Sequence, residues 1–478
     1  MSIDEQINEA FKPISDAVSS VIFYAEPVTG YDIKLILVWL AAASIFMTVY
    51  LGFINLRYFG HSINVLRGKY DKKGEDGQIN RFQALTTSLS GTVGLGNIAG
   101  VAVAVSAGGP GAVFWLVIMG LFGMSAKFAE AALGVKYRIH PDPERPEIIS
   151  GGPMYYIKAA FEKIKMKRLG SVLAVLFAIF CIGGAIGAGN MFQANQAFQQ
   201  LVNVSGGEAS YFSDKGWMVG LLLSVLVGAV IIGGLKSIAA VASRIVPFMG
   251  GLYLLAGIVV IIMNIHNLIP SLVMIVQMAL TPEAGFGAIL GALLIGVQRA
   301  AFSNEAGIGS AAIVHAAAQT DKPISQGFVG MLGPFIDTIV ICMVTALVIV
   351  ITGAYEGGAG MEGVSLTSRA FESSIPWFPY VLALTVFLFA YSTMIAWFYY
   401  GLKSLTYLTG SKPAIEMGYK IFFCLCVVIG ASSALDNIIG FSDAILFAMA
   451  IPNIMALYLL APELKRDLKE YVKSIEIK

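Results

Sequence analysis

The sequence is poor in charged residues. Asp, Glu, Lys and Arg make up 13% of its 478 residues and hydrophobic residues make up 57%, whereas soluble chains carry about 25% charged residues. Lys and Arg (31) nearly balance Asp and Glu (30), so we expect no basic surface for nucleic acid. The composition predicts an integral membrane protein.

Reactive cysteines and enzyme motifs are also missing. The four cysteines, Cys181, Cys342, Cys424 and Cys426, all lie in apolar runs, which is typical of packing residues rather than of disulfides or a zinc site. The sequence has no GxxxxGK[ST] phosphate loop and no HExxH motif, so we expect neither an ATP-driven pump nor an enzyme, and no cofactor. No basic start with a short apolar run opens the chain, so we expect no cleaved signal peptide.

Long apolar runs recur along the whole chain. A bilayer core of about 30 Å needs about 20 apolar helical residues. We therefore predict an all-α membrane protein with eleven transmembrane helices, near residues 34–58, 82–106, 112–137, 171–200, 217–233, 243–264, 285–315, 327–352, 378–402, 418–434 and 440–461. Residues 154–165 are too short and too charged to span the membrane and are predicted to lie at its interface.

The basic residues gather on one side of this layout. When the connections are assigned alternately to two sides, 25 of the 31 Lys and Arg residues fall on one side and four on the other. The side rich in Lys and Arg is the cytoplasmic one. We expect a multi-pass protein of the cell (plasma) membrane, with an extracellular N-terminal tail (1–33) and a cytoplasmic C-terminal tail (463–478).

Two predicted spans are interrupted in the middle by glycine and polar residues. The second contains LSGTVGLGNIAG (Leu89–Gly100) and the seventh contains FSNEAGIGS (Phe302–Ser310). Unwound backbone at membrane depth is stable only where it lines a cavity or is buried in protein. Close packing through small residues would explain the glycines, but not the Asn, Ser and Glu residues beside them. The breaks predict a polar site in mid-membrane.

The two breaks stand in matching positions. The second to sixth spans (82–264) and the seventh to eleventh (285–462) form two sets of five, each beginning with its broken span, and the first span (34–58) is extra. Because five is odd, the two sets enter the membrane from opposite sides. An inverted repeat with broken helices predicts a secondary transporter. A channel is an alternative, because it also needs polar residues at depth.

Several motifs, in the same order, resemble those of a known family. They are GTVGLGNIAG (Gly91–Gly100), GGPGAVFW (Gly108–Trp115), GGPMYY (Gly151–Tyr156), NEAGIGSAAIVHAAA (Asn304–Ala318) and STMIAWFYYG (Ser392–Gly401). Over residues 50–462 the chain resembles the sodium:alanine symporter family, which is related in fold to the leucine transporter class. The resemblance implies sodium-coupled uptake of alanine, and of glycine as well, by alternating access. A proton-coupled transporter with Glu305 as carrier is the alternative.

A small neutral amino acid brings a carboxylate into the membrane. The half-helix that begins at the first break offers unpaired N–H groups and a positive dipole end, which favour an anion. By the resemblance, the Leu95 and Gly96 amides hold the carboxylate. Asn97 either binds sodium or caps its own half-helix. Gln193 is a candidate for binding the ammonium or carboxylate, or for a hydrogen bond between helices.

Further residues are candidates for the walls of this pocket. Phe302 and Ile308 flank the second break and are predicted to line it. By the resemblance, Trp397 borders the side-chain end of the pocket, where its indole would exclude a leucine side chain. Glu305 is predicted either to neutralise the ammonium or to line the inward pathway.

Sodium needs oxygen ligands, which unwound carbonyls and hydroxyls supply. By the resemblance, one sodium site is formed by the hydroxyls of Ser392 and Thr393 with the carbonyls of Ser90, Val93 and Phe389. Back-bonding of these hydroxyls to their own helix is the alternative. A second sodium site is left open at Thr92, Ser303 and Thr338.

Four charged residues fall within or at the ends of predicted spans. Arg299 and Asp443 are candidates for an ion pair that closes an outer gate. Lys127 and Glu130, three residues apart, are predicted to form a local pair. We assign no metal other than sodium, and the sequence implies no protein partner.

Overall fold

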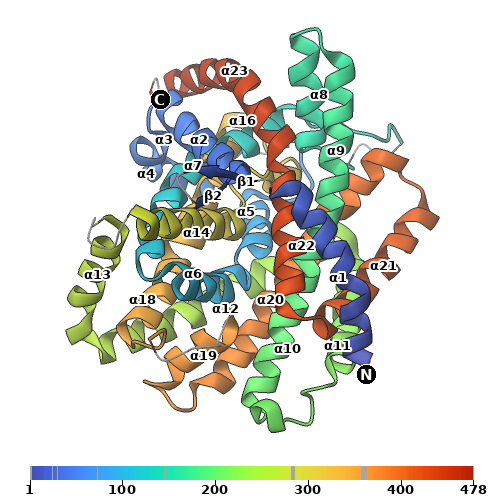
Figure 1. Cartoon of the computed structure of the whole chain (residues 1–478). Helices are drawn as coiled ribbons and strands as arrows, with labels where there is room; N and C mark the ends of the chain where they lie inside the picture. The colour runs from blue at the N-terminus through green and yellow to red at the C-terminus, as the bar shows by residue number, and fades with distance from the viewer. Residues whose placement is uncertain are drawn as a thin grey trace.

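The structure, a computed structural model, is a bundle of helices with one short hairpin. It describes residues 3–23, 25–28, 31–72, 74–144, 147–280, 286–356 and 363–476. The hairpin pairs β1 (Ala25–Val28) with β2 (Tyr31–Lys34) in antiparallel register, with Ala25 opposite Lys34. The start of the first helix and the end of the last lie at opposite ends of the molecule (Figure 1).

Within the described ranges, seven helical runs are long and apolar enough to cross a membrane, or eight if one bent pair counts as a single span. The seven are α7 (Gly111–Lys136), α9 (Lys167–Ile186) with η2 (Gly187–Met191) and α10 (Phe192–Val204), α12 (Gly234–Met263), α16 (Pro323–Gly330) with α17 (Leu332–Pro334), η6 (Phe335–Cys342) and α18 (Met343–Ile351), α20 (Phe378–Thr409), α21 (Pro413–Ser432), and α22 (Leu435–Ala448) with α23 (Ala450–Glu476).

The bent pair is the second predicted span. It consists of α5 (Arg81–Thr92), followed by η1 (Gly96–Gly100) and α6 (Val101–Gly108), and it bends by 53°. The seventh predicted span is broken as well, into α14 (Phe286–Asn304) and α15 (Ser310–His315). Both interrupted patterns in the sequence therefore correspond to broken helices.

The remaining helices are shorter. They are α1 (Ile3–Ile22), α2 (Leu35–Tyr50), α3 (Ile54–Arg57), α4 (Phe59–Leu66), α8 (Pro153–Lys163), η3 (Gly207–Ala209), α11 (Gly216–Ile231), η4 (Ile265–Asn267), α13 (Leu268–Leu280) and α19 (Val364–Glu372). Helix α8 matches the predicted interfacial segment. Because α2, α11 and α14 are short apolar helices, the count of eleven spans stays a prediction.

Three helices were not predicted. Helix α1 lies along α22 (Figure 1), where the rings of Phe11 and Phe441 are 5.4 Å apart, so part of the predicted N-terminal tail is packed against the bundle. Helices α13 and α19 lie between predicted spans. Helix α23 continues to Glu476, so the predicted C-terminal tail is helical within the described residues.

The central elements of the bundle are α7 and the two broken helices. Helix α7 contacts α14, α15 and α16, and α5 packs against α12 and α20. Helix α5 begins with a capping box, in which Asn80 and Gln83 exchange side-chain to backbone hydrogen bonds of 2.8 and 3.1 Å, so its start is fixed locally. This packing brings both breaks to the interior.

Candidate functional site

The two breaks lie beside each other. The first is unwound over residues 93–95, and η1 after it contacts both α14 and η6. In the second, Glu305, Gly307 and Gly309 have φ values of 55°, 88° and 94°. A left-handed conformation costs a residue with a side chain more than it costs glycine. Glu305 must therefore be held in place by its partners.

The first break is stabilised by two side-chain amides. The Leu95 N–H donates to Gln193 Oε1 at 3.0 Å, and the Gly94 N–H donates to Asn97 Oδ1 at 2.9 Å. Gln193 in turn donates to the carbonyl of Ala188 at 2.9 Å. The structure thus brings Leu95, Asn97 and Gln193 together, with an amide oxygen at the half-helix start where we predict an anion.

Asp337 lies between the two breaks and was missed by the sequence analysis. Its carboxylate is fully buried and accepts hydrogen bonds from Asn97 (2.6 Å), Ser303 (2.8 Å) and Thr338 (2.8 Å). Within the described ranges it forms no ion pair. A sequence signal existed, because Asp337 is the one charged residue in the predicted span 327–352 and an ionisable residue in a membrane helix is functional by default.

Trp397 connects the breaks on the other side. Its indole N–H lies 3.2 Å from the carbonyl of Gly91, in the last turn of α5, and 3.1 Å from Glu305 Oε1. The other Glu305 oxygen accepts a hydrogen bond from Ser310. The indole is fixed from behind by Gly189, where a Cβ atom would lie only 2.2 Å from Trp397 Cγ. One side chain of α20 thus touches both broken helices.

Lys127 and Glu130 do more than pair locally. The Lys127 ammonium is 3.9 Å from Glu130, but it also donates to the backbone carbonyl of Glu305 at 3.1 Å. Glu130 accepts from Asn453 at 2.9 Å, and Asn453 also donates to the carbonyl of Gly307 at 2.9 Å. These buried side chains from α7 and α23 therefore bind carbonyls that the second break leaves free.

A small cavity lies between the breaks. It is lined by Gly91, Thr92, Gly96, Ala188, Gln193, Phe302, Glu305 and Trp397. The centre of a water molecule can occupy about 10 Å³ of it, which is room for about one water. A bound amino acid therefore requires some of these side chains to move. Ile308 is buried in the second break and is not among the lining residues.

The residues of the predicted sodium site also meet. Ser90 Oγ donates to the carbonyl of Ser392 at 2.7 Å, and Ser392 Oγ donates back to Phe389 at 3.0 Å. Thr393 Oγ1 is buried and has no hydrogen-bond partner among the described residues. It faces the first break, because a Cβ atom on Gly94 would lie 2.5 Å from it. The structure thus separates a back-bonded Ser392 from an unsatisfied Thr393.

The residues of the open second sodium site divide. Ser303 and Thr338 both bond the carboxylate of Asp337. Thr92 is back-bonded to Ser88 at 3.3 Å and lines the small cavity instead.

The predicted gate residues form a buried ion pair. Arg299 and Asp443 are in contact, with side chains 5% and 2% exposed. Gln298 also donates to Asp443 at 2.7 Å, and Lys34 lies 3.3 Å from Gln298. The Arg299 guanidinium lies 5.4 Å from the centre of the Phe302 ring. The pair therefore joins α14 to α22 directly beside a wall of the cavity.

Two broken membrane helices around a buried polar cavity define a secondary transporter of the broken-helix type. The fold agrees with the solved structure of MhsT in complex with L-phenylalanine, with a TM-score of 0.56, 13% identity and coverage of 82% of this chain and 98% of that one. This is the leucine-transporter fold expected from the motifs.

The family follows from the sequence comparisons. The model of the sodium:alanine symporter family matches residues 16–478, and the chain belongs to that family. It is 41% identical over 438 residues to the sodium/alanine symporter AgcS of Methanococcus maripaludis, covering 91% of this chain and 93% of AgcS. It is 33% identical over 444 residues to the probable sodium/glutamine symporter GlnT of Bacillus subtilis, covering 92% and 88%. The protein is therefore a transporter and not an enzyme.

Proposed function

We propose that this protein couples the inward flow of sodium to the uptake of alanine, and of glycine as well, by alternating access. The observation that carries the proposal is the small polar cavity enclosed by both broken helices, with one side chain, Trp397, bonded to each. The similarity to the sodium/alanine symporter AgcS supports the choice of substrate and ion.

We further propose that the chain spans the membrane eleven times as an inverted repeat. Residues 82–264 and 285–462 are the two repeats, and 34–58 is the extra first span. The charge asymmetry places the N-terminus outside and the C-terminus in the cytoplasm. The position of the two broken helices, each at the start of its set, supports this division.

The substrate binds between the breaks in this proposal. Its carboxylate takes the position at Leu95 and Gly96 where Gln193 Oε1 accepts the Leu95 N–H, so the Gln193 amide moves or shares this position. Its ammonium faces the carboxylate of Glu305, which lines the same cavity. Phe302 and Trp397 close the cavity over the substrate.

Two cation sites flank the substrate. The first is formed by Ser392, Thr393 and the carbonyls of Ser90, Val93 and Phe389, and the unsatisfied Thr393 hydroxyl supports it. The second is centred on Asp337, because a buried carboxylate without an ion pair is costly unless a cation neutralises it. One charge moved across about 100 mV contributes about 2.3 kcal/mol and a tenfold sodium gradient adds about 1.4 kcal/mol, so one ion supports accumulation of roughly 500-fold.

The direct test is alanine uptake into proteoliposomes with one driving force at a time. An inward sodium gradient should accumulate labelled alanine, and lithium or a proton gradient alone should not. Uptake driven by protons alone would instead favour the alternative with Glu305 as carrier. Saturable accumulation also separates a transporter from a channel, which would only equilibrate alanine.

The first sodium site predicts a specific effect at Thr393. Thr393→Val keeps the shape of the side chain and removes the hydroxyl, so the sodium concentration for half-maximal uptake should rise by about tenfold or more. Maximal uptake at saturating sodium should persist. The matched control is Thr385→Val on the same helix, whose hydroxyl is bonded 2.9 Å from the carbonyl of Val381 and which should change the sodium dependence less than twofold. Equal effects of the two variants would place sodium elsewhere.

The position of Trp397 in the cavity predicts a size limit for the substrate. Trp397→Ala should let valine and leucine compete with labelled alanine and should weaken alanine binding, because the alanine methyl group loses its wall. Trp397→Phe keeps a large ring but removes the N–H that Glu305 and Gly91 accept, so it should still exclude leucine. If leucine competes no better with Trp397→Ala than with the parent, Trp397 does not set the limit.

A further inference from the structure

A second and larger cavity lies beyond the central site, at the end of α20. It has a volume of about 520 Å³, within the range of about 300 to 1,000 Å³ typical of small-molecule sites. Its walls come from the last turns of α20, the starts of α12 and α21, and the segment that precedes α8. In the proposed orientation all of these ends are cytoplasmic.

Lys403 is the central polar group of this cavity. Its ammonium donates to the carbonyl of Ile149 at 2.8 Å and to the hydroxyl of Ser150 at 3.1 Å. Among the described residues it forms no salt bridge. An ammonium has three donors, and these two bonds leave one of them for a ligand. A lysine amine that is held by neutral groups at a cavity wall favours an anionic partner.

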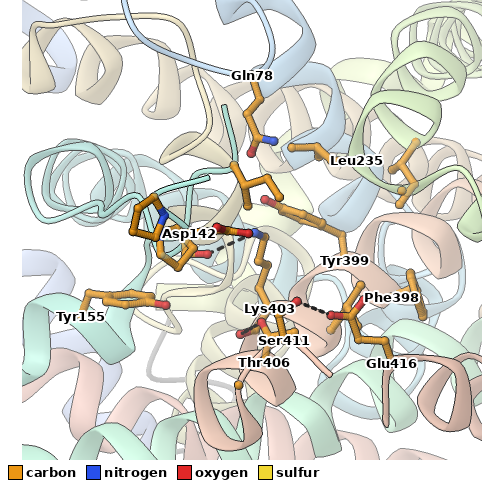
Figure 2. A pocket seen from close by; sticks show the side chains of 18 residues that line it. Gln78, Asp142, Tyr155, Leu235, Phe398, Tyr399, Lys403, Thr406, Ser411 and Glu416 are labelled. Atoms are coloured by element: carbon orange, nitrogen blue, oxygen red, sulfur yellow. Dashed lines mark hydrogen bonds between the residues drawn. The ribbon is translucent and has the colours of Figure 1, made fainter. Parts of the chain in front are cut away.

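The other charges in the cavity indicate what kind of anion it takes. Asp142 and Glu416 line the same cavity, and Glu416 accepts a hydrogen bond from Ser411 at 2.6 Å. Figure 2 shows the Lys403 side chain in the middle of the cavity, with Asp142 on one side and the Ser411–Glu416 pair on the other. One cation and two carboxylates suit a zwitterion, whereas the phosphate of a lipid would be repelled by the carboxylates.

The cavity also lies in line with the central site. Trp397 and Lys403 are six residues apart on α20, so they are separated by about 9 Å along the helix axis. The wall between them includes the aromatic residues Phe398 and Tyr399. A substrate that leaves the central cavity toward the cytoplasm along α20 therefore meets this cavity next.

We propose that this cavity is a second, cytoplasm-facing binding site for the transported amino acid. Lys403 binds the carboxylate of the amino acid, and Glu416 and Asp142 face its ammonium. This inference rests on the proposed function, because it takes both the amino acid substrate and the membrane orientation from it. It assigns to the cytoplasmic face an affinity that residues outside the central site determine.

The test compares the two faces of the membrane. Right-side-out and inside-out vesicles that contain the full chain exchange labelled alanine in sodium, and the alanine concentration for half-maximal exchange is measured at each face. Lys403→Gln should raise this concentration by about tenfold or more at the cytoplasmic face, because a charge-assisted hydrogen bond is lost, and by less than twofold at the extracellular face. Lys403→Arg should stay within about threefold of the parent, and Lys420→Gln on α21, outside the cavity, should have no effect.

Other roles of Lys403 give different results. If Lys403 only fixes the segment at Ile149 and Ser150, Lys403→Gln will lower the maximal rate in both directions without a difference between the faces, which overturns the proposal. If Lys403→Gln does not reach the membrane, Glu416→Gln decides, because Glu416 does not hold that segment. It should raise the half-maximal concentration severalfold at the cytoplasmic face alone, and no change there overturns the proposal.

Two further outcomes separate this proposal from its neighbours. Exchange that needs phosphatidylglycerol in the vesicles, loses that need in Lys403→Gln and keeps its cytoplasmic half-maximal concentration would assign the cavity to a lipid headgroup and overturn the second site. A parent protein that exchanges no alanine in sodium would contradict the proposed function itself. Exchange that neither Lys403→Gln nor Glu416→Gln alters at the cytoplasmic face contradicts only the second site.

Discussion

Backbone that leaves its helix inside a membrane bundle must find new hydrogen-bond partners, and the centre of this protein is arranged around that requirement. Gln193 and Asn97 accept the N–H groups freed at the first break. Lys127 and Asn453 donate to carbonyls freed at the second. Because these partners come from four different helical runs, the breaks fix how the bundle packs. The same unwound segments then supply the polar surface on which a zwitterion and a cation can bind.

The broken helices could be predicted from the sequence because they violate a local rule. Glycine together with Asn, Ser and Glu in the middle of an apolar run is unfavourable for a continuous helix, and it is visible without any tertiary contact. The contact between Arg299 and Asp443 followed from placing two lone charges on the same side of the layout. The helix ends were shifted by several residues. The first span, for example, was predicted to reach residue 58, but α2 ends at Tyr50, because polar composition changes gradually along the chain.

The rest depends on contacts between distant residues. Asp337 meets Asn97 across 240 positions, and Asn453 meets Glu130 across 323, so no local pattern pairs them. Helices α1, α13 and α19 are too short or too polar to be recognised as spans, although α19 reaches the first half-helix through a 3.1 Å bond from Thr367 to the carbonyl of Ile98. Periodicity identifies which residues share a helix face, but not which helix that face meets.

The central claim is that the buried carboxylate between the two breaks is neutralised by a transported cation. Alanine binding to the purified full chain, measured as a function of sodium concentration for the parent and for Asp337→Asn, tests it most directly. Removing the charge while keeping the shape should raise the sodium concentration for half-maximal binding by about tenfold or more, because an ionic ligand of a buried cation is lost. An Asp337→Asn protein that is folded and binds alanine with unchanged sodium dependence would contradict the account.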